Sequence, residues 1–397
     1  MNKSYLLFLI LFLLFSQTAF AEQQAYSVQT LDTSSGIVSP VSFGIVKDEK
    51  GFIWVATRLG VDRYDGLHFK HYSMKESDMR MADDGVRHDL LQNEDGEIYA
   101  FSDLGKIFHY NEDIDSFEEL HQVKSFLGGH SLHALGIEEN RLILGRFNGI
   151  MILDRSTLSI TSILCPENNI RCIIPFENKT YLVGSEHGLW CLDLAQNSCE
   201  QIACPDLDVM SLYYDRDQQR IWMGTKGNGL WTLRLDNTEA IQIPNWEHAI
   251  VTSIAPYADS QLLVGTDGSG LLQTSRIFIS SLQLLAGTTL EAPNTLPSSA
   301  VQAVFVDDMN IWLATYDCGM VLMAPNPLLG VMNLPETKYT SDKYCSDSSS
   351  RLTRYCLTAA LSSTPFCSSA NTLLFSTATC SEYQPETRTL FSSVTRR

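Results

Sequence analysis

The chain has 397 residues, of which 44% are hydrophobic and 19% are charged, and its formal net charge is −18. This balance is typical of a folded globular protein, and the length is sufficient for one large domain or two smaller ones. The acidity argues against binding to nucleic acid or to an anionic membrane surface, because both need clustered Lys and Arg side chains. We attribute the charge to solubility.

The N-terminus has the layout of a secretory signal peptide. Lys3 precedes an unbroken apolar run over residues 5–15, and Ala19-Phe20-Ala21 is a small-x-small cleavage pattern before Glu22. The run is short for a membrane-spanning helix, and no later stretch of the sequence is apolar enough to cross a membrane. We therefore expect residues 1–21 to be removed on export and the mature chain to contain no membrane span. An uncleaved N-terminal anchor is the alternative.

A short pattern then recurs along the chain: an apolar and often aromatic residue, an apolar residue, a small residue, Thr or Ser, and a Gly two to four residues later. It is clearest in Ile53-Trp54-Val55-Ala56-Thr57, Ile221-Trp222-Met223-Gly224-Thr225 and Ile311-Trp312-Leu313-Ala314-Thr315. The second copy, around Tyr99, is weaker and has Phe101 at the small position. The turn glycines, which recur at intervals of 39 to 49 residues, are Gly60, Gly105, Gly149, Gly188, Gly229, Gly270 and Gly319.

Each copy belongs to a set of four short apolar stretches separated by turns rich in Gly, Asp and Asn. In the first copy these stretches are residues 42–46, 53–57, 61–64 and 68–72. Seven antiparallel units of about forty residues each predict an all-β fold, a β-propeller of four-stranded blades over residues 22–335. The bulky motif residue would fill the space between blades, and the small one would let the next blade approach. We expect the strand-like residues 26–31 to complete the last blade and close the ring.

The first copy resembles the repeat of the two-component regulator propeller family. The resemblance rests on the lead-in Leu31–Ser39 and on Asp48-x-x-Gly51-Phe52-Ile53-Trp54-Val55-Ala56-Thr57-x-x-Gly60-Val61-Asp62-Arg63-Tyr64-Asp65-Gly66. It covers roughly residues 25–335 and is most specific in the first, fifth and seventh copies. What it implies is the periplasmic, ligand-sensing propeller of a bacterial signal-transduction receptor.

Full-length receptors of this family usually carry two propellers, a β-sandwich, a transmembrane helix and a cytoplasmic histidine kinase or diguanylate cyclase, and they dimerise through the later parts. This chain has about half of those repeats and shows no sequence signature of either output enzyme. The resemblance therefore implies a truncated receptor that lacks its output module and is not an enzyme. An exported propeller enzyme of the polysaccharide-lyase type and a protein-binding scaffold are the alternatives.

The composition changes abruptly after Thr340. Residues 341–397 contain 22 Ser or Thr among 57 positions, four Cys and no Gly. We expect residues 336–397 to lie outside the propeller and to have little stable structure. Our interpretation is an out-of-frame segment at the end of a frameshifted or truncated gene, and a genuine Ser/Thr-rich flexible tail is the alternative.

No motif for a metal or a cofactor emerges from the sequence. Asp113-x-Asp115, Asp206-x-Asp208 and Asp215-x-Asp217 lack the Gly and the distal Glu of a calcium loop, and Gly227-Asn228-Gly229 lacks the helix and the Lys of a phosphate loop. We therefore expect no metal and no cofactor. Export permits disulfides among the cysteines of the propeller region, but their pairing stays open, and buried free thiols are the default for most of them. These cysteines are Cys165, Cys172, Cys191, Cys199, Cys204 and Cys318.

The functional surface of a propeller is usually the mouth of its channel, where the loops that lead into the innermost strands converge. By register, eight polar residues are expected there: Ser42, Arg87, His88, His133, Arg171, Ser211, Thr252 and Gln302. Their hydrogen-bond donors and two Arg side chains favour a polar or anionic small molecule, such as a sugar, a uronate or an oligosaccharide.

Overall fold

The computed structural model describes residues 26–74 and 87–326, apart from Glu94, Glu139, Thr238 and Leu290. The described residues belong to one unit within residues 1–330. The signal peptide predicted at residues 1–21 and the tail predicted at residues 336–397 lie outside the described residues.

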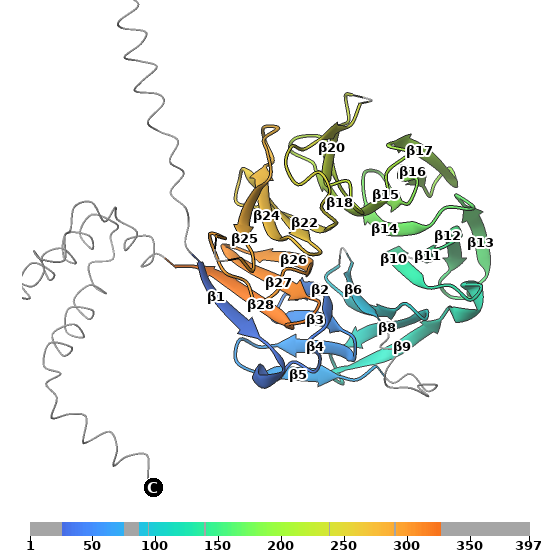
Figure 1. Ribbon diagram of the computed structural model, residues 1–397. Helices are drawn as coiled ribbons and strands as arrows, with labels where there is room; N and C mark the ends of the chain where they lie inside the picture. The colour runs from blue at the N-terminus through green and yellow to red at the C-terminus, as the bar shows by residue number, and fades with distance from the viewer. Residues whose placement is uncertain are drawn as a thin grey trace, which may run out of the picture. The chain divides into compact units, whose positions relative to one another are not determined.

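Seven four-stranded antiparallel sheets form a ring, with one strand of each sheet innermost and one at the rim (Figure 1). From the innermost strand outward, blades 1 to 4 are β2 (Ser42–Lys47), β3 (Ile53–Thr57), β4 (Gly60–Tyr64) and β5 (Phe69–Tyr72); β6 (His88–Gln92), β7 (Ile98–Ser102), β8 (Lys106–Asn111) and β9 (Ser116–Gln122); β10 (Leu132–Glu138), β11 (Arg141–Arg146), β12 (Gly149–Asp154) and β13 (Ile160–Leu164); and β14 (Ile170–Pro175), β15 (Thr180–Ser185), β16 (Gly188–Asp193) and β17 (Ser198–Ala203). Blades 5 to 7 are β18 (Val209–Asp215), β19 (Arg220–Thr225), β20 (Leu230–Arg234) and β21 (Ile241–Gln242); β22 (Val251–Tyr257), β23 (Gln261–Thr266), β24 (Gly270–Ser275) and β25 (Gln283–Ala286); and β26 (Val301–Asp307), β27 (Asn310–Thr315), β28 (Met320–Pro325) and β1 (Tyr26–Leu31). The predicted all-β propeller of seven blades is confirmed.

Helical structure is almost absent from the described residues. Two short 3-10 helices, Thr33–Ser35 and Lys124–Phe126, are the helical segments found there. Among the described residues, no helix has the length and apolar character needed to cross a membrane.

The two ends of the described chain meet in the seventh blade. β1 pairs antiparallel with β28, with Tyr26 opposite Pro325 and Leu31 opposite Met320. The N-terminal strand thereby supplies the outer strand of a blade whose other three strands come from the C-terminal side. The prediction that residues 26–31 close the ring is therefore confirmed.

The repeat motif forms the second strand of each blade. Trp54, Trp222 and Trp312 occupy equivalent, buried places on these strands. The small residue lies where the next blade comes closest, because a Cβ on Gly224 would overlap Val251 Cγ1 of the neighbouring blade. All seven predicted turn glycines have positive φ values. At Gly149 a Cβ would also lie only 2.5 Å from the carbonyl oxygen of Cys165, so the turn requires glycine.

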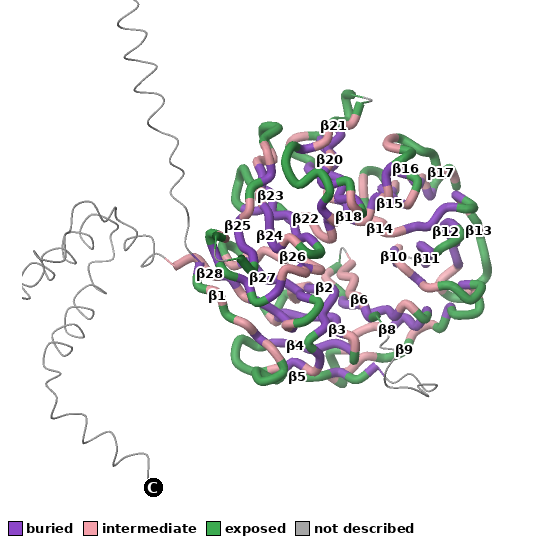
Figure 2. The backbone as a smooth tube through the Cα atoms, viewed as in Figure 1, coloured by how far each residue is buried: buried purple, intermediate pink, exposed green. Residues whose placement is uncertain are grey.

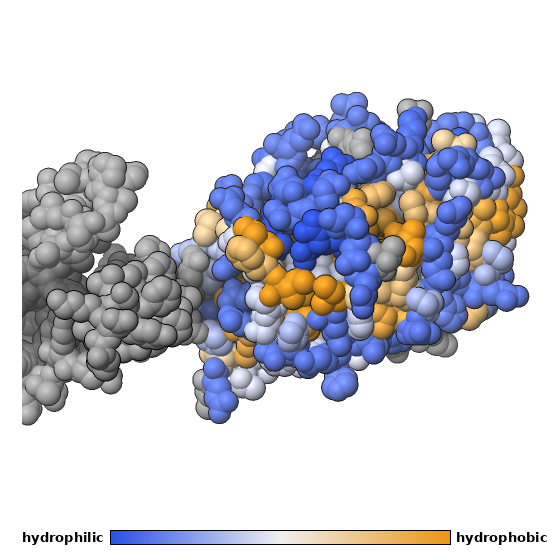
Figure 3. All heavy atoms as spheres, turned by 90° about the horizontal axis from the view of Figure 1, so that it is seen from above, coloured by the Kyte–Doolittle hydropathy of each residue, from blue (hydrophilic) through white to orange (hydrophobic). Residues whose placement is uncertain are grey.

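The hydrophobic core consists of layers between neighbouring blades. One layer combines Trp222 and Leu230 of blade 5 with Leu262 and Val264 of blade 6. Figure 2 shows buried residues along the middle strands, a mixture of buried and half-buried residues along the innermost strands, and exposed ones at the rim and in the turns. The face drawn in Figure 3 is largely hydrophilic, with apolar side chains gathered in separate patches. Because a single sheet cannot bury both of its faces, the stability of each blade depends on its two neighbours.

One disulfide links the rims of blades 3 and 4. Cys165, directly after β13, is bonded to Cys199 of β17, with 6.4 Å between the two Cα atoms. Burial raises the pKa of Cys172 to about 12 and also raises the pKa of the other three free thiols, which makes them unreactive at neutral pH. The expectation of buried free thiols for most cysteines of the propeller is confirmed in part: Cys172, Cys191, Cys204 and Cys318 are free, but they are half-buried.

Candidate ligand-binding site

Six of the seven innermost strands contain a β-bulge near their first residue. A bulge holds an extra residue without a partner on the adjacent strand, and it redirects the side chain of that residue. In blade 2 the innermost strand has no register shift, and Asp89 pairs directly with Phe101. The extra residues of the other six blades are Phe43, His133, Arg171, Met210, Thr252 and Gln302.

The bulges bring side chains from several blades together at one end of the ring axis. A cavity of about 310 Å³, here called the channel cavity, lies where the innermost strands begin. Five of the eight residues predicted at the channel mouth line it, namely Arg87, His133, Arg171, Thr252 and Gln302. The rest of its lining is Asp89, Phe101, Asp103, Ser131, Leu132 and Met210.

The structure does not bring the other three predicted residues, Ser42, His88 and Ser211, to the channel cavity. All three are buried between blades and contact the backbone of a neighbouring blade. Ser42 Oγ donates a hydrogen bond to Gly319 O over 2.7 Å, and His88 Nδ1 lies 3.1 Å from Thr57 O. Ser211 Oγ donates a hydrogen bond to Val251 O of the next blade over 3.2 Å.

The bulges explain why two of these residues, Ser42 and Ser211, lie elsewhere. Each bulge shifts the alternation of side chains by one residue, so the residue redirected toward the axis is Phe43 rather than Ser42 and Met210 rather than Ser211. In blade 2, Asp89 lines the channel cavity in place of its neighbour His88. In blades 1 and 5 the redirected residue is apolar and the adjacent polar residue is buried between blades.

The two arginines of the channel cavity are both paired with carboxylates. Arg171 forms a bidentate pair with Asp208, with Nε 2.9 Å from Oδ1 and Nη2 2.8 Å from Oδ2. Arg87 is held more loosely, with Nη2 3.4 Å from Asp89 Oδ2 and its guanidinium 4.9 Å from the ring centre of Phe43. Arg171 is thus fixed in one orientation, while Arg87 is half exposed and free to adjust to a ligand.

His133 is a neutral hydrogen-bonding group of the channel cavity. Burial lowers its pKa, and the nearby positive charges of Arg171 and Arg87 lower it further, so the imidazole is uncharged at neutral pH. Nδ1 lies 3.1 Å from the carbonyl oxygen of Ile170, which places the proton on Nδ1. Nε2 is therefore the acceptor of the ring, and the Asn169 side chain also contacts the imidazole.

Carboxylates and amides around the channel cavity were not among the residues predicted for it. Asp208 was not predicted, although it lies two residues before Met210 and the repeat register marks it once the bulge is known. Asn168 and Asn169 are buried in the loop before β14, and they carry amide atoms without a hydrogen-bond partner among the described residues. In the described part of the chain, no group of three or more His, Cys, Asp or Glu side chains is placed to hold a metal ion.

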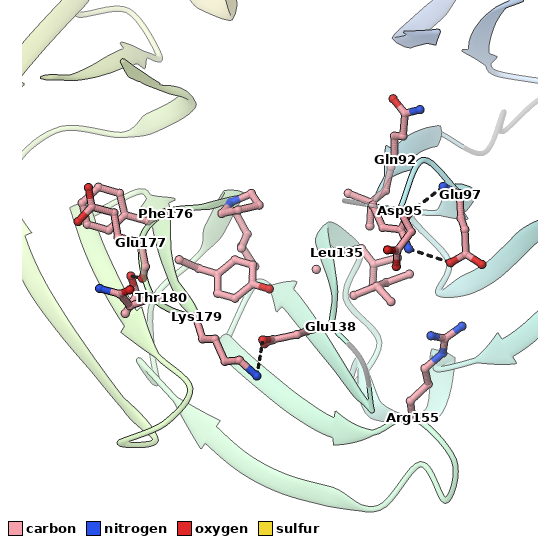
Figure 4. A pocket seen from close by; sticks show the side chains of 18 of the residues that line it. Gln92, Asp95, Glu97, Leu135, Glu138, Arg155, Phe176, Glu177, Lys179 and Thr180 are labelled. Atoms are coloured by element: carbon pink, nitrogen blue, oxygen red, sulfur yellow. Dashed lines mark hydrogen bonds and ion pairs between the residues drawn. The ribbon is translucent and has the colours of Figure 1, made fainter. Parts of the chain in front are cut away.

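A larger cavity, here called the lower cavity, opens at the other end of the innermost strands (Figure 4). It has a volume of about 770 Å³ and lies among blades 2, 3 and 4. β6, β10 and β14 line it with Leu91, Leu135 and Ile173, and the turns that follow these strands line it with charged side chains. Sequence analysis did not predict this cavity.

A ring of seven four-stranded blades with a polar cavity at one end defines the class of this protein. Its fold is that of the extracellular propeller domains of hybrid two-component systems. The extracellular domain of BT4673 from B. thetaiotaomicron superposes with a TM-score of 0.60 at 23% sequence identity, over 75% of this chain and 39% of that chain. The domain of BT3049 gives a TM-score of 0.60 at 21% identity, over 76% and 42%. This chain therefore spans about two fifths of the length of these domains.

The same fold also occurs in an enzyme. Virginiamycin B lyase from Staphylococcus aureus superposes with a TM-score of 0.59 at 13% identity, over 76% of this chain and 100% of the lyase. No family model and no curated protein matches the chain. The comparisons thus confirm the resemblance to the two-component propellers at the level of the fold.

Proposed function

We propose that this chain is the periplasmic, ligand-sensing propeller of a signal-transduction receptor. The observation that carries the proposal is the channel cavity, into which bulges redirect side chains from five separate blades. A ligand held by several blades changes the relative stability of their arrangements, which is the physical basis of a sensor. The extracellular location of the structurally similar domains supports export.

The ligand that suits the channel cavity is a small saccharide, neutral or with a single carboxylate. A cavity of about 310 Å³ is at the small end of the range for ligand pockets. Since Arg87 and Arg171 already face carboxylates, the cavity offers hydrogen bonds more than uncompensated positive charge. Gln302 and His133 add donors and an acceptor, which sugar hydroxyl groups match.

Isothermal titration calorimetry with the full chain tests this proposal. The probes are a panel of mono- and disaccharides in which each uronate is matched with its neutral sugar. We expect Arg171→Ala and Arg87→Ala to weaken binding of the best probe at least tenfold. Arg234→Ala, which removes an exposed Arg that pairs with Asp236 away from the channel cavity, is the matched control. Unchanged affinity in both cavity variants would refute the assignment of the site.

The second candidate is a propeller enzyme, which the full-length match to virginiamycin B lyase favours. A lyase needs a base and an acid that converge on one bond. In the described residues, the channel cavity is lined by one histidine, His133, and by no Tyr or Glu. Ultraviolet absorbance of unsaturated products, measured after incubation with polysaccharides and with virginiamycin B, distinguishes the two functions, because turnover of either would replace the sensor proposal.

A further inference from the structure

The lower cavity exists because blades 2 and 3 are parted. Neighbouring innermost strands lie against each other in six of the seven pairs, and among the described residues β6 and β10 are the exception. Figure 1 shows the wide separation of these two strands. Phe101 accounts for it, since it stands where the other six blades have Ala or Gly and packs in the same buried cluster as Leu132 and Leu135 of β10. A bulky ring at this position holds blade 3 away.

The floor of the lower cavity is apolar. Leu91 of β6, Leu135 and Ile137 of β10, and Ile173 of β14 face it, and the ring of Phe176 adds an aromatic wall. Leu135 is buried and the others are half-buried. A ligand that lies across this floor needs an apolar body.

The two ends of the lower cavity are acidic. Figure 4 shows Asp95 and Glu97, from the turn between β6 and β7, on one wall and Glu177, from the turn between β14 and β15, on the opposite wall. No Lys or Arg of the described residues forms an ion pair with these three carboxylates, but His109 Nε2 lies 3.6 Å from Glu97 Oε1, so Glu97 has a partner of its own. Glu97 and Glu177 also accept hydrogen bonds from tyrosine hydroxyls over 2.7 Å. A neutral donor orients a carboxylate and leaves its charge in place.

Each cation that lines the lower cavity has a partner of its own. Lys179 lies 3.9 Å from Glu138, midway between the acidic walls. Arg155 donates to the hydroxyl of Tyr99 over 3.2 Å and lies over its ring. Arg216 points to the carbonyl oxygen of Phe176 at 3.5 Å. Asp95 on one wall and Glu177 on the other therefore keep their negative charges, and the apolar floor separates them.

We propose that the lower cavity binds a linear aliphatic diamine or polyamine. One terminal ammonium group pairs with Glu177 and the other with Asp95, while the methylene chain lies on Leu135 and Ile137. The net charge of −18 attracts such a cation over a longer range. This site is separate from the channel cavity and does not depend on the saccharide proposal.

Titration calorimetry with the purified full chain tests the diamine proposal. The probes are cadaverine and spermidine, with pentylamine and 1,5-pentanediol as the singly charged and uncharged counterparts of cadaverine. We expect the diamine to bind at least tenfold more tightly than the monoamine, no heat from the diol, and a loss of affinity with added salt. Equal affinity of diamine and diol would overturn the proposal, and so would the absence of binding by both amines.

Two variants and a control assign the binding to the two walls. Glu177→Gln removes the charge and keeps an acceptor for the Tyr214 hydroxyl. Asp95→Asn removes the charge on the opposite wall. Each should weaken cadaverine binding about tenfold without a change in melting temperature. Glu200→Gln, on the exposed face of β17, should bind like the unchanged protein. Wild-type affinity in both wall variants would show that the amine binds elsewhere, and the proposal would be withdrawn.

Discussion

The small residue of the repeat motif offers a direct test of how the blades are held together. A Cβ on Gly224 would overlap Ser211 Oγ and Val251 Cγ1 and would lie 2.9 Å from Val251 Cβ. Val251 is β-branched, fully buried and held in β22, so it has no alternative rotamer to adopt. We predict that Gly224→Ala lowers the free energy of unfolding by about 1–3 kcal/mol, the range for an added methyl group in a packed core.

Gly287→Ala is the matched control. A Cβ on Gly287 would meet its nearest atom, Leu284 Cδ1, at 3.5 Å, which is an ordinary van der Waals contact, and the backbone there does not have a positive φ. We expect this change to be neutral or to stabilise the protein by about 0.4–1 kcal/mol, because Ala restricts the unfolded chain more than Gly does.

Urea unfolding followed by tryptophan fluorescence measures both variants. For Gly224→Ala the midpoint should fall while the slope m stays constant, since the change acts on the native packing and not on the surface exposed. The melting temperature should fall by roughly 2–4 °C for each kcal/mol, the scale for domains of 150–250 residues. Equal midpoints for the two variants would show that blades 5 and 6 are not wedged together at Gly224, and the packing argument for the ring would fail.

An ion cluster, the disulfide and a buried histidine each give a further measurable expectation. Hydrogen bonds from Lys70, Tyr72 and Tyr110 hold the pKa of Asp115 well below its ordinary value, so its contribution to stability is present above the unfolded-state pKa of about 4 and is lost as the pH falls. Asp115→Asn should therefore flatten the acid side of a plot of melting temperature against pH, and an unchanged profile contradicts this reasoning. Reduction of the Cys165–Cys199 bond, or Cys199→Ser, should cost about 2–4 kcal/mol of stability in urea unfolding with and without dithiothreitol. Coincident curves would show that the bond does not restrain the unfolded chain. Because burial and the charge of Arg171 lower the pKa of His133, the affinity for the channel ligand should fall as the pH falls through that pKa and the acceptor Nε2 is protonated. Calorimetry on either side of this pKa should show the dependence in the unchanged protein and its loss in His133→Gln; a dependence that survives the substitution places the titration on another group.

Much of the fold could be predicted from the sequence because each motif position has one packing role. Trp222 and Gly224 lie two residues apart on β19. This pattern repeats along the sequence only if every blade meets its neighbour in the same way. The closure by residues 26–31 could also be predicted, since an unpaired strand and an incomplete last blade fit each other. Periodicity is a strong signal when the same contact recurs around a ring.

The position of the site residues was harder to predict because it depends on the bulges. A one-residue shift moves every side chain to the other face of a strand, and the residues around Ser42 and Ser211 carry no sequence mark of a bulge. The pairing of Cys165 with Cys199 depends on which rims come together in space. The lower cavity depends on Phe101, which is visible in the sequence as a departure from the motif but whose effect on the neighbouring blade appears only in the structure.

The two cavities follow from how polarity changes along the same three strands. Channel-facing residues alternate with residues that face the neighbouring blade, so Asp89 and Leu91 share one face of β6, and Arg171 and Ile173 share one face of β14. The polar member of each pair comes first, and the apolar member follows. The channel therefore begins as a hydrogen-bonding surface that suits a saccharide, and it ends as an apolar surface bordered by the carboxylates of the turns. Because different residues of the same strands face the two cavities, a substitution such as Arg171→Ala changes the first site without removing a contact from the second, and the two proposals stand or fall separately.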